Sequence, residues 1–357
     1  MMKRVSILFI ALILTLQFVS AQDLQAVLDS QVGEEMPGIL FSISSADLNW
    51  SGAAGVIDTE SKEPLTPENT FRIASVTKTY VAASILRLME EGKLNQSDPI
   101  SQHISAEHLD ILAQDYPVDQ ITIRQTLRHS AGFFDHTNAP EFFDRILTTP
   151  SHEWTRTEQL KLCVEKGEPI GPPGEQFSYS DTGYLILGEI IEKYTGKDLD
   201  GGIKELLGLE KFGLERTDFE RRDPETDSLR IHQYFQGIDT FGFSPTVDYY
   251  GGGGLLSTTS ELVQFFQALF VGQIFKNPET LEIMLEPVSY AEKARMDYQL
   301  GMYRVQIAGK LAYTHTGFWG TQVVYIPDLE IFMAANYSSA WKGSAVAPIF
   351  SEILEEL

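Results

Sequence analysis

Strand-like segments stand at both ends of this chain, and helix-like segments fill the interval between them. Near the N-terminus, an apolar run from Gly38 to Ser44 is followed by a turn at Ala46-Asp47 and a second run to Ile57, which predicts a hairpin. Short runs suited to strands return late in the chain, at residues 299–307, 311–315, 322–326 and 331–336. This order predicts one sheet built from both ends of the chain, with a helical region inserted in the middle.

Apolar periodicity and capping residues mark the helices. Residues 75–91 predict a helix that is apolar nearly all round and stops at Gly92, and residues 182–194 predict another. Capping-box spacing opens further helices at Thr122/Gln125, Thr155/Glu158 and Thr258/Glu261, and residues 345–354 predict a closing helix. We therefore place the sheet part at about residues 22–100 and 285–357, and the helical insertion at about residues 101–284.

The first 21 residues predict a signal peptide. Lys3 and Arg4 form a basic start, residues 5–16 are almost wholly apolar, and small residues at 19–21 allow cleavage there. A membrane anchor is the alternative, but about 15 apolar residues fall short of the ~20 that a spanning helix needs. We expect a periplasmic or secreted protein with no stable membrane span after cleavage.

Charge and composition exclude several classes of function. The chain has 50 Asp and Glu against 27 Lys and Arg, a formal net charge of −23, so it would repel nucleic-acid phosphates over most of its surface. The single cysteine, Cys163, lies on an apolar helical face and predicts a buried structural thiol. The histidines show no metal-binding spacing, so we expect no metal or other cofactor.

The run Gly251 to Gly254 invites comparison with a phosphate-binding loop. No Gly-Lys-Ser/Thr follows it, whereas a capping box does. The sequence therefore favours a turn that leads into a helix.

Ser75 and Lys78 are the first candidate catalytic residues. In a helix that starts at Ser75, Lys78 lies one turn on and on the same face. A serine hydroxyl is a poor nucleophile unless a neighbour takes its proton, and an amine at this spacing can assist. Taken alone, the pair also fits a capping serine and a surface lysine, but few positions in this apolar helix are polar, and a buried lysine needs a reason.

Two further short motifs follow. Tyr179-Ser180-Asp181 comes just before the helix at 182–194, where a tyrosine can present its phenol to a cleft or pack as a half-buried aromatic. His315-Thr316-Gly317 lies at the end of a late strand, where a hydroxyl donor and a glycine would let substrate approach closely. Taken alone, the second of these is also an ordinary strand end.

Taken together and in this order, the three motifs resemble the serine β-lactamase-like group, which contains class C β-lactamases, D-alanyl-D-alanine carboxypeptidases and related esterases. The pattern of that group is S-x-x-K, then Y-x-N, then K/H-T/S-G. The resemblance extends from about Pro37 to the C-terminus and includes the segments 71–74, 91–94, 127–132 and 253–258. It implies a β-lactamase/transpeptidase-like α+β fold, an antiparallel sheet flanked by helices with a mostly helical insertion, and one catalytic domain over residues 22–357.

The resemblance also implies roles for individual residues. Ser75 would form the acyl-enzyme, Lys78 would activate it, and Tyr179 would act as general base and as proton donor to the leaving group. The backbone N–H groups of Ser75 and Phe318 would form the oxyanion hole. The remaining substrate-binding positions would be Asp181, His315, Thr316 and Gly317.

Two positions depart from the pattern of a penicillin-hydrolysing enzyme. His315 replaces a lysine, and a histidine is only partly charged at neutral pH, so it would attract a substrate carboxylate less firmly. Asp181 stands where the group usually has an asparagine, and an ionised carboxylate can only accept hydrogen bonds. We expect Asp181 to pair with Lys78, to disfavour the amide carbonyl of penicillin side chains, and to tolerate an amine.

The sequence thus predicts an exported serine hydrolase that is D-alanyl peptidase-like or esterase-like. Its partner would be a small-molecule or peptide substrate, for example one derived from the cell wall. The alternatives are a true β-lactamase and a non-catalytic protein that keeps the penicillin-binding fold.

Overall fold

The computed structural model describes residues 21–220, 228–288, 297–340 and 348–356. The signal peptide predicted for residues 1–21 therefore lies outside the described residues, apart from Ala21, which begins α1 (Ala21–Gln31). No helix among the described residues is both long and apolar enough to cross a membrane.

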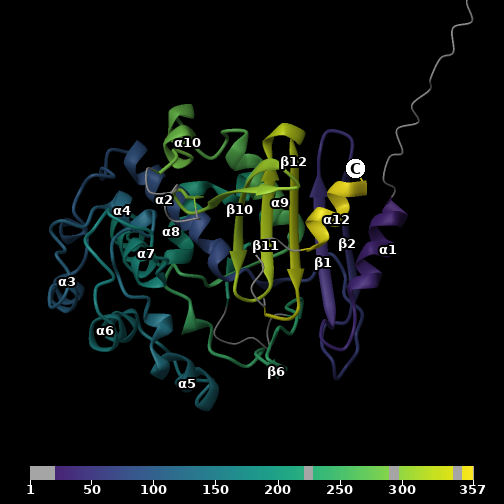
Figure 1. Cartoon of the computed structure of the whole chain (residues 1–357), viewed down its shortest axis with the longest axis horizontal. Coiled ribbons are helices and arrows are strands. Elements are labelled where there is room, and N and C mark those ends of the chain that lie inside the picture. Colours follow the sequence, from purple (N-terminus) through teal and green to yellow (C-terminus); the bar gives the residue numbers. More distant parts are fainter. Residues whose placement is uncertain (1–20, 221–227, 289–296, 341–347, 357) are drawn as a thin grey trace, which may run out of the picture.

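A seven-stranded antiparallel sheet is the centre of the fold, with strand order β2-β1-β12-β11-β10-β9-β8. Its strands are β1 (Gly38–Ser44), β2 (Asn49–Gly55), β8 (Asp297–Tyr298), β9 (Tyr303–Ile307), β10 (Lys310–Gly317), β11 (Thr321–Ile326) and β12 (Ile331–Tyr337). The N-terminal hairpin pairs with the last strand along the chain, so both ends of the sequence build one sheet, as predicted (Figure 1).

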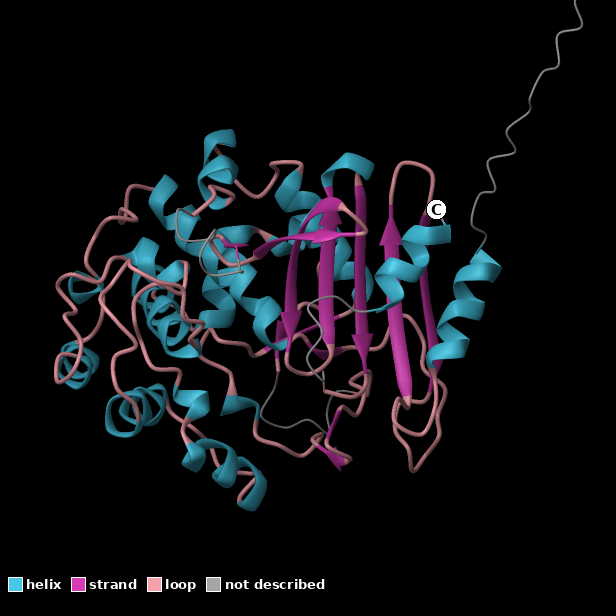
Figure 2. Ribbon diagram, viewed as in Figure 1, coloured by secondary structure: helices cyan, strands magenta, loops and turns pink. Residues whose placement is uncertain are grey.

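Helices cover both faces of this sheet (Figure 2). On one face, α1 and α12 (Pro348–Glu356) pack their apolar side chains against alternate residues of β1, such as Phe41. On the other face, α9 (Thr259–Phe270) lies against β1 and β12, and Ser42 of β1 hydrogen-bonds to Thr259 at 2.7 Å. Because both faces are covered, every residue of β1 and β12 is buried.

The helix that carries Lys78, α2 (Thr77–Glu90), is buried at every position from Thr77 to Leu88. It packs against α7 (Asp181–Thr195) and α8 (Leu199–Leu207) of the helical region, and Tyr80 stacks on Phe265 of α9 at 3.7 Å between ring centroids. The helix thus lies between the sheet layer and the helical region, which explains why its sequence is apolar nearly all round.

The helical region extends away from the sheet (Figure 1). Its other helices are α3 (Ala106–Leu112), α4 (Ile123–Leu127), α5 (Pro140–Thr148), α6 (Arg156–Lys166) and, beyond α9, α10 (Pro278–Met284). The capping boxes predicted at Thr122 and Thr155 are present. Two small sheets complete the fold, β3 (Phe71–Arg72), β7 (Leu255–Ser257) and β4 (Asp218–Phe219) in one, and β5 (Tyr234–Phe235) with β6 (Ile238–Asp239) in the other.

Two local expectations need correction. The helix predicted from Ser75 begins instead as a short 3-10 turn, η1 (Ala74–Val76), which leads into α2. The glycine run at 251–254 does not lead directly into a helix, because β7 intervenes and pairs with β3 and β4 before α9 starts. In both places a contact distant in sequence decides the local conformation.

Candidate active site

Ser75 lies in η1, at the junction between the small sheet and α2. The preceding residue, Ala74, has a φ of 46°, a left-handed conformation that costs energy for a residue with a Cβ. Strand β10 packs closely here, because a Cβ on Gly317 would collide with the carbonyl oxygen of Ile73. The close approach of β10 therefore requires glycine at 317 and places the end of that strand beside Ser75.

Lys78 is fully buried, and its ammonium forms two hydrogen bonds and one ion pair. Its Nζ lies 3.0 Å from Ser75 Oγ, 2.6 Å from the carbonyl oxygen of Gly252 and 2.6 Å from Asp181 Oδ1. A lysine ammonium has three donors and no acceptor, and here two of them are hydrogen-bonded while the charge is paired with Asp181. The glycine run at 251–254 thus supplies a backbone acceptor for a buried cation.

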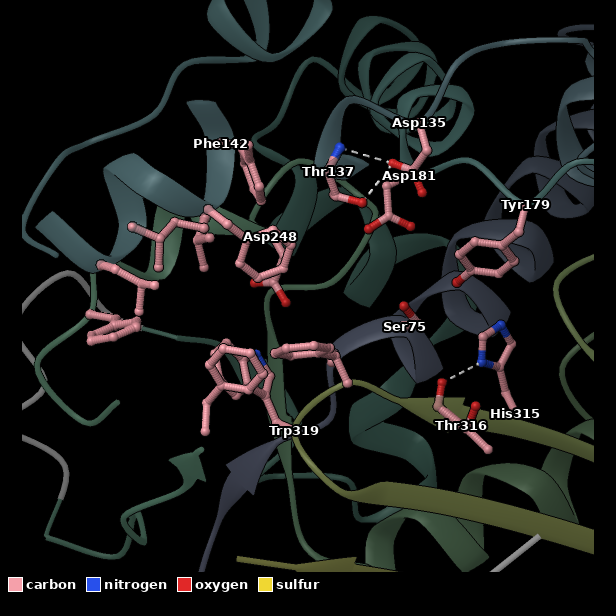
Figure 3. A pocket seen from close by; sticks show the side chains of 18 of the residues that line it. Ser75, Asp135, Thr137, Phe142, Tyr179, Asp181, Asp248, His315, Thr316 and Trp319 are labelled. Carbon is pink, nitrogen blue, oxygen red and sulfur yellow. Dashed lines mark hydrogen bonds between the residues drawn. The ribbon is translucent and has the colours of Figure 1, made fainter. Parts of the chain in front are cut away.

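Tyr179 lies directly before α7, and its hydroxyl points toward Ser75 (Figure 3). The Lys78 ammonium lies 5.1 Å from the centre of the Tyr179 ring. Burial, followed by repulsion from Asp181, raises the pKa of Tyr179 well above its usual value of 10.0. The phenol is therefore protonated in the resting protein.

His129 supports Tyr179 from behind, and sequence reasoning did not single it out as part of the site. The two ring centroids are 4.1 Å apart, and His129 Nδ1 accepts a hydrogen bond of 3.1 Å from the backbone N–H of Ser180. Burial, and then the charge of Lys78, lowers the pKa of His129 well below 6.5, so the ring is neutral. Its position in the segment 127–132, which resembles the family, was the available signal.

His315 is neutral, which corrects the expectation of a partly charged group. It is buried, and burial together with the charge of Lys78 lowers its pKa to about 3. Its Nδ1 donates to the carbonyl oxygen of Thr316 at 2.8 Å, so its Nε2 accepts from the hydroxyl of Tyr298 at 3.0 Å. No positive charge stands at this position to hold a substrate carboxylate.

The other predicted binding positions lie around the end of β10. Thr316 and Phe318 line the same cavity as Ser75, while Gly317 sets the backbone approach described above. Among the described residues, neither the N–H of Ser75 nor that of Phe318 donates to another backbone carbonyl. The assignment of these two groups to an oxyanion hole stays a prediction.

A cavity of about 330 Å³ opens from Ser75 and contains two acidic residues that sequence reasoning missed, Asp135 and Asp248 (Figure 3). Asp135 follows two phenylalanines, and Asp248 comes three residues before the glycine run. That proximity to segments resembling the family was the only signal in the sequence. Aromatic side chains form much of the remaining wall, among them Phe142, Phe143, Phe235, Phe243, Phe318 and Trp319.

Cys163 lies away from this cavity and is a buried free thiol, as predicted. Its Sγ lies 3.3 Å from the hydroxyl of Tyr116, and burial raises its pKa to about 11. Within the part of the chain that the structure describes, no group of three or more His, Cys, Asp or Glu side chains is arranged to hold a metal ion.

Known proteins resemble this chain in sequence and in fold. It is 26% identical over 299 residues to penicillin-binding protein 4* of Bacillus subtilis, which covers 79% of this chain and 63% of that protein. The chain spans 58–63% of the length of the first curated relatives that it matches.

Solved structures share the fold across nearly the whole chain. A D-stereospecific amidohydrolase from Streptomyces sp. superposes with a TM-score of 0.76 at 23% identity, covering 90% of this chain and 95% of that one. A D-amino acid amidase from Ochrobactrum anthropi SV3, complexed with D-phenylalanine, gives a TM-score of 0.77 at 20% identity, covering 93% and 97%.

The family model for beta-lactamase matches residues 24–345, which is most of the chain and includes every candidate site residue described above. The seven-stranded antiparallel sheet with its helical insertion is the fold expected of that family. This chain belongs to the beta-lactamase family of serine hydrolases and penicillin-binding proteins.

Proposed function

We propose that this protein is an exported serine hydrolase that cleaves an amide or ester bond through an acyl-enzyme on Ser75. The observation that carries the proposal is the 3.0 Å contact between Lys78 Nζ and Ser75 Oγ. Burying an ammonium is costly unless partners compensate it, and this one is held by Asp181 and Gly252 in an orientation that faces the serine hydroxyl. A cation in this position stabilises the negative charge that develops on Ser75 Oγ as its proton leaves.

In acylation, Ser75 Oγ forms a bond to the substrate carbonyl carbon while its proton passes to Tyr179 Oη. The original phenolic proton of Tyr179 passes to the leaving nitrogen or oxygen as the bond from carbon to that atom breaks. The raised pKa of Tyr179 supports this shared-proton route over a standing phenolate. The Lys78 ammonium stabilises the negative charge that develops on Oγ and Oη during the transfer.

In deacylation, water takes the place of the leaving group. Its oxygen bonds to the acyl carbon, its proton passes through Tyr179 to Ser75 Oγ, and the ester bond to Ser75 breaks. In both steps the backbone N–H groups of Ser75 and Phe318 stabilise the tetrahedral oxyanion. The products are an acid and the amine or alcohol that left first.

The electrostatics of the site favour an amidase or esterase over a carboxypeptidase or a true β-lactamase. The neutral His315 offers no charge to a substrate carboxylate, and three aspartates line the cavity. The amide-hydrolysing activities in the names of the two solved relatives are consistent with this choice. The basic and apolar start of the chain supports export and a mature domain over residues 22–357.

The test is a panel of p-nitrophenyl acetate, a D-Ala-D-Ala peptide, an amino acid amide and nitrocefin. We expect wild type to hydrolyse the ester and the amide, Ser75→Ala to lose both activities, and Ser30→Ala, on an exposed face of α1, to retain them. Mass spectrometry of enzyme quenched during turnover should find the acyl adduct on the peptide that contains Ser75. Ester hydrolysis that survives Ser75→Ala, or wild type inert toward the whole panel, would overturn the proposal.

A further inference from the structure

Two carboxylates in the cavity have no cationic partner. Asp181 is paired with Lys78, but Asp135 and Asp248 form no ion pair within the described residues. Asp135 accepts hydrogen bonds from the backbone N–H and hydroxyl of Thr137, at 3.1 and 2.9 Å, and the side chain of Trp319 acts to lower the pKa of Asp248. These neutral donors position the two carboxylates without neutralising them.

Two arginines near the wall of the cavity already interact with other groups. Arg72, which lies 5.3 Å from the Trp319 ring, donates to Glu220 and to two backbone carbonyls. Arg230 pairs with the same glutamate. Lys78 is engaged by Ser75, Gly252 and Asp181, so no described cation forms an ion pair with Asp135 or Asp248.

Both carboxylates are destabilised as anions. Burial, and then repulsion from Asp181, raises the pKa of Asp135 to about 7. Burial likewise raises the pKa of Asp248 to about 6, although the charge of Arg72 acts in the opposite direction. A positive charge entering the cavity would relieve this cost, since buried charges are stable when they are paired.

The position of these groups relative to Ser75 indicates which part of a substrate they meet. In Figure 3, Tyr179 and His315 lie on one side of Ser75, whereas Asp248, Phe142 and Trp319 lie on the other. Because Tyr179 would protonate the leaving group, the leaving group belongs on the Tyr179 side. The acyl part then lies toward Asp248, and Asp135, which lies beside Asp181 and Thr137 between the two groups in this view, stands at the edge of that half of the cavity.

This acyl half of the cavity is also strongly aromatic. Phe318 is tilted against Phe235 and edge-on to Trp319, with ring centroids 5.2 and 4.8 Å apart, and remains 39% exposed at the rim. Phe143 of α5 approaches Phe318 from the helical side at 6.1 Å. The walls thus suit an apolar or aromatic group next to a positive charge.

We propose that the substrate is an amide or ester whose acyl part carries a free ammonium group, bound against Asp135 and Asp248, next to an apolar or aromatic side chain. An α-aminoacyl amide or ester with an unblocked amine has this chemistry. The inference rests on the proposed hydrolase function and assigns to Asp135 and Asp248 the recognition of the acyl part.

The test compares phenylalanine p-nitroanilide, in both enantiomers, with the 3-phenylpropionyl analogue that lacks the amine and with the N-acetyl derivative. We expect kcat/KM for a free-amine enantiomer to exceed that of the 3-phenylpropionyl analogue at least tenfold at pH 7.5. Asp135→Asn and Asp248→Asn should each bring this ratio toward one, mainly through KM. Asp47→Asn, in the exposed turn between β1 and β2, removes the same charge and should keep the ratio.

A second measurement does not depend on turnover of anilides. Phenethylamine, 2-phenylethanol and 3-phenylpropionate share a phenyl group, and their side chains end in a positive, a neutral and a negative group, respectively. As competitive inhibitors of p-nitrophenyl acetate hydrolysis, they should rank in that order, with phenethylamine at least tenfold stronger than the carboxylate and weakened by either aspartate variant.

The reverse order of inhibition, or a free-amine preference that both aspartate variants retain, would overturn the inference while leaving the hydrolase intact. A wild-type protein that does not hydrolyse p-nitrophenyl acetate would overturn the proposed function instead. In that case direct binding of phenethylamine and 3-phenylpropionate, measured by calorimetry, still decides the charge preference of the cavity. Tighter binding of the carboxylate would exclude an ammonium subsite.

Discussion

The two halves of the active-site cavity are built on opposite electrostatic principles. On the side of Tyr179, Lys78 has three acceptors, His129 and His315 are neutral, and each charge has a partner. Away from these groups, Asp248 lines the acyl side of the cavity and Asp135 stands at its edge, and neither forms an ion pair with another described residue. The catalytic half is complete without substrate, and the acyl half is not.

This difference teaches how a single cavity can serve two purposes. Groups that move protons work best when they are held in one geometry before substrate arrives. Groups that select a substrate can be left short of a partner, because the substrate then supplies the missing charge. Such unpaired charge lowers the stability of the empty protein, a common compromise at functional sites. The predictions below test this contrast between a satisfied half and an unsatisfied half.

The largest effect is expected from Lys78→Met. It removes the ammonium beside Ser75 Oγ, and we expect kcat to fall about 10³- to 10⁴-fold, near the upper end for a lost proton-transfer group. Because it also strands Asp181, unfolding free energy should fall by roughly 3–5 kcal/mol. Urea denaturation and steady-state kinetics measure both quantities.

The double variant Lys78→Met/Asp181→Asn separates the two effects. Replacing the stranded carboxylate by an amide should recover much of the stability and none of the activity. If activity returned together with stability, Lys78 would be only a structural residue, and the catalytic half would not be the activating machinery that we propose.

Tyr179→Phe should lower kcat about 10²-fold for an amide. The loss should be smaller for p-nitrophenyl acetate, because p-nitrophenolate leaves without needing a proton. Melting temperature should change little, since the phenylalanine ring keeps the contact with His129. An equal loss on amide and ester would rule out proton donation to the leaving group as the main role of Tyr179.

Asp135→Asn should stabilise the protein, in contrast to the changes in the catalytic half. The folded pKa of about 7 lies above the usual 3.8, so the carboxylate costs stability as pH rises from about 4 to 7. We expect a melting temperature several degrees above wild type at pH 8 and an equal one at pH 4, measured by calorimetry. If the variant were less stable than wild type at pH 8, the Asp135 carboxylate would not be the destabilising, unpaired charge that we propose.

The pH dependence of stability has the opposite sign for His315: its contribution rises with pH. Its folded pKa of about 3 lies below the usual 6.5, so its contribution to stability is complete above pH 6.5 and is lost as pH falls toward 3. In a His315→Asn variant, the slope of stability against pH between 4 and 6 should therefore be shallower than in wild type. An unchanged slope would mean that His315 does not have the depressed pKa expected of a buried neutral group.

The smallest effect on hydrolytic activity is expected for Asp181→Asn. An amide in this place can donate a hydrogen bond to a substrate carbonyl, so penicillin or nitrocefin hydrolysis should rise a few-fold. The Lys78 ammonium would keep Ser75 and Gly252 as acceptors but lose its counter-ion, so the unfolding free energy should also fall, by roughly 3–5 kcal/mol. No gain, with ester hydrolysis retained, would show that Asp181 does not determine the choice between acyl groups.

Local patterns predicted much of the fold. The strand-like runs at both ends of the chain form one sheet, and the capping boxes at Thr122 and Thr155 start helices. Such features depend on residues near one another in sequence, so they can be recognised there. The 3-10 turn at Ser75 and the strand β7 after the glycine run were missed, because contacts with β10 and with β3 impose them.

The sequence by itself determined which residues we propose as catalytic. The i, i+3 spacing of Ser75 and Lys78 brings hydroxyl and amine together on almost any helical turn, and the resemblance of three motifs brought Tyr179 and His315 into the same site. The spacing of Ser75 and Lys78 can be recognised without knowledge of the packing, because spacing along a helix is a property of the backbone.

Only the tertiary structure decided the charges that these residues hold and the other groups that they meet. The neutrality of His315 and the raised pKa of Tyr179 come from burial, and burial is a sum over neighbours from the whole chain. Asp135 and Asp248 are 113 positions apart in sequence yet line one cavity. The free energy of a charge depends on distance and solvent exposure, and the order of residues along the chain gives neither.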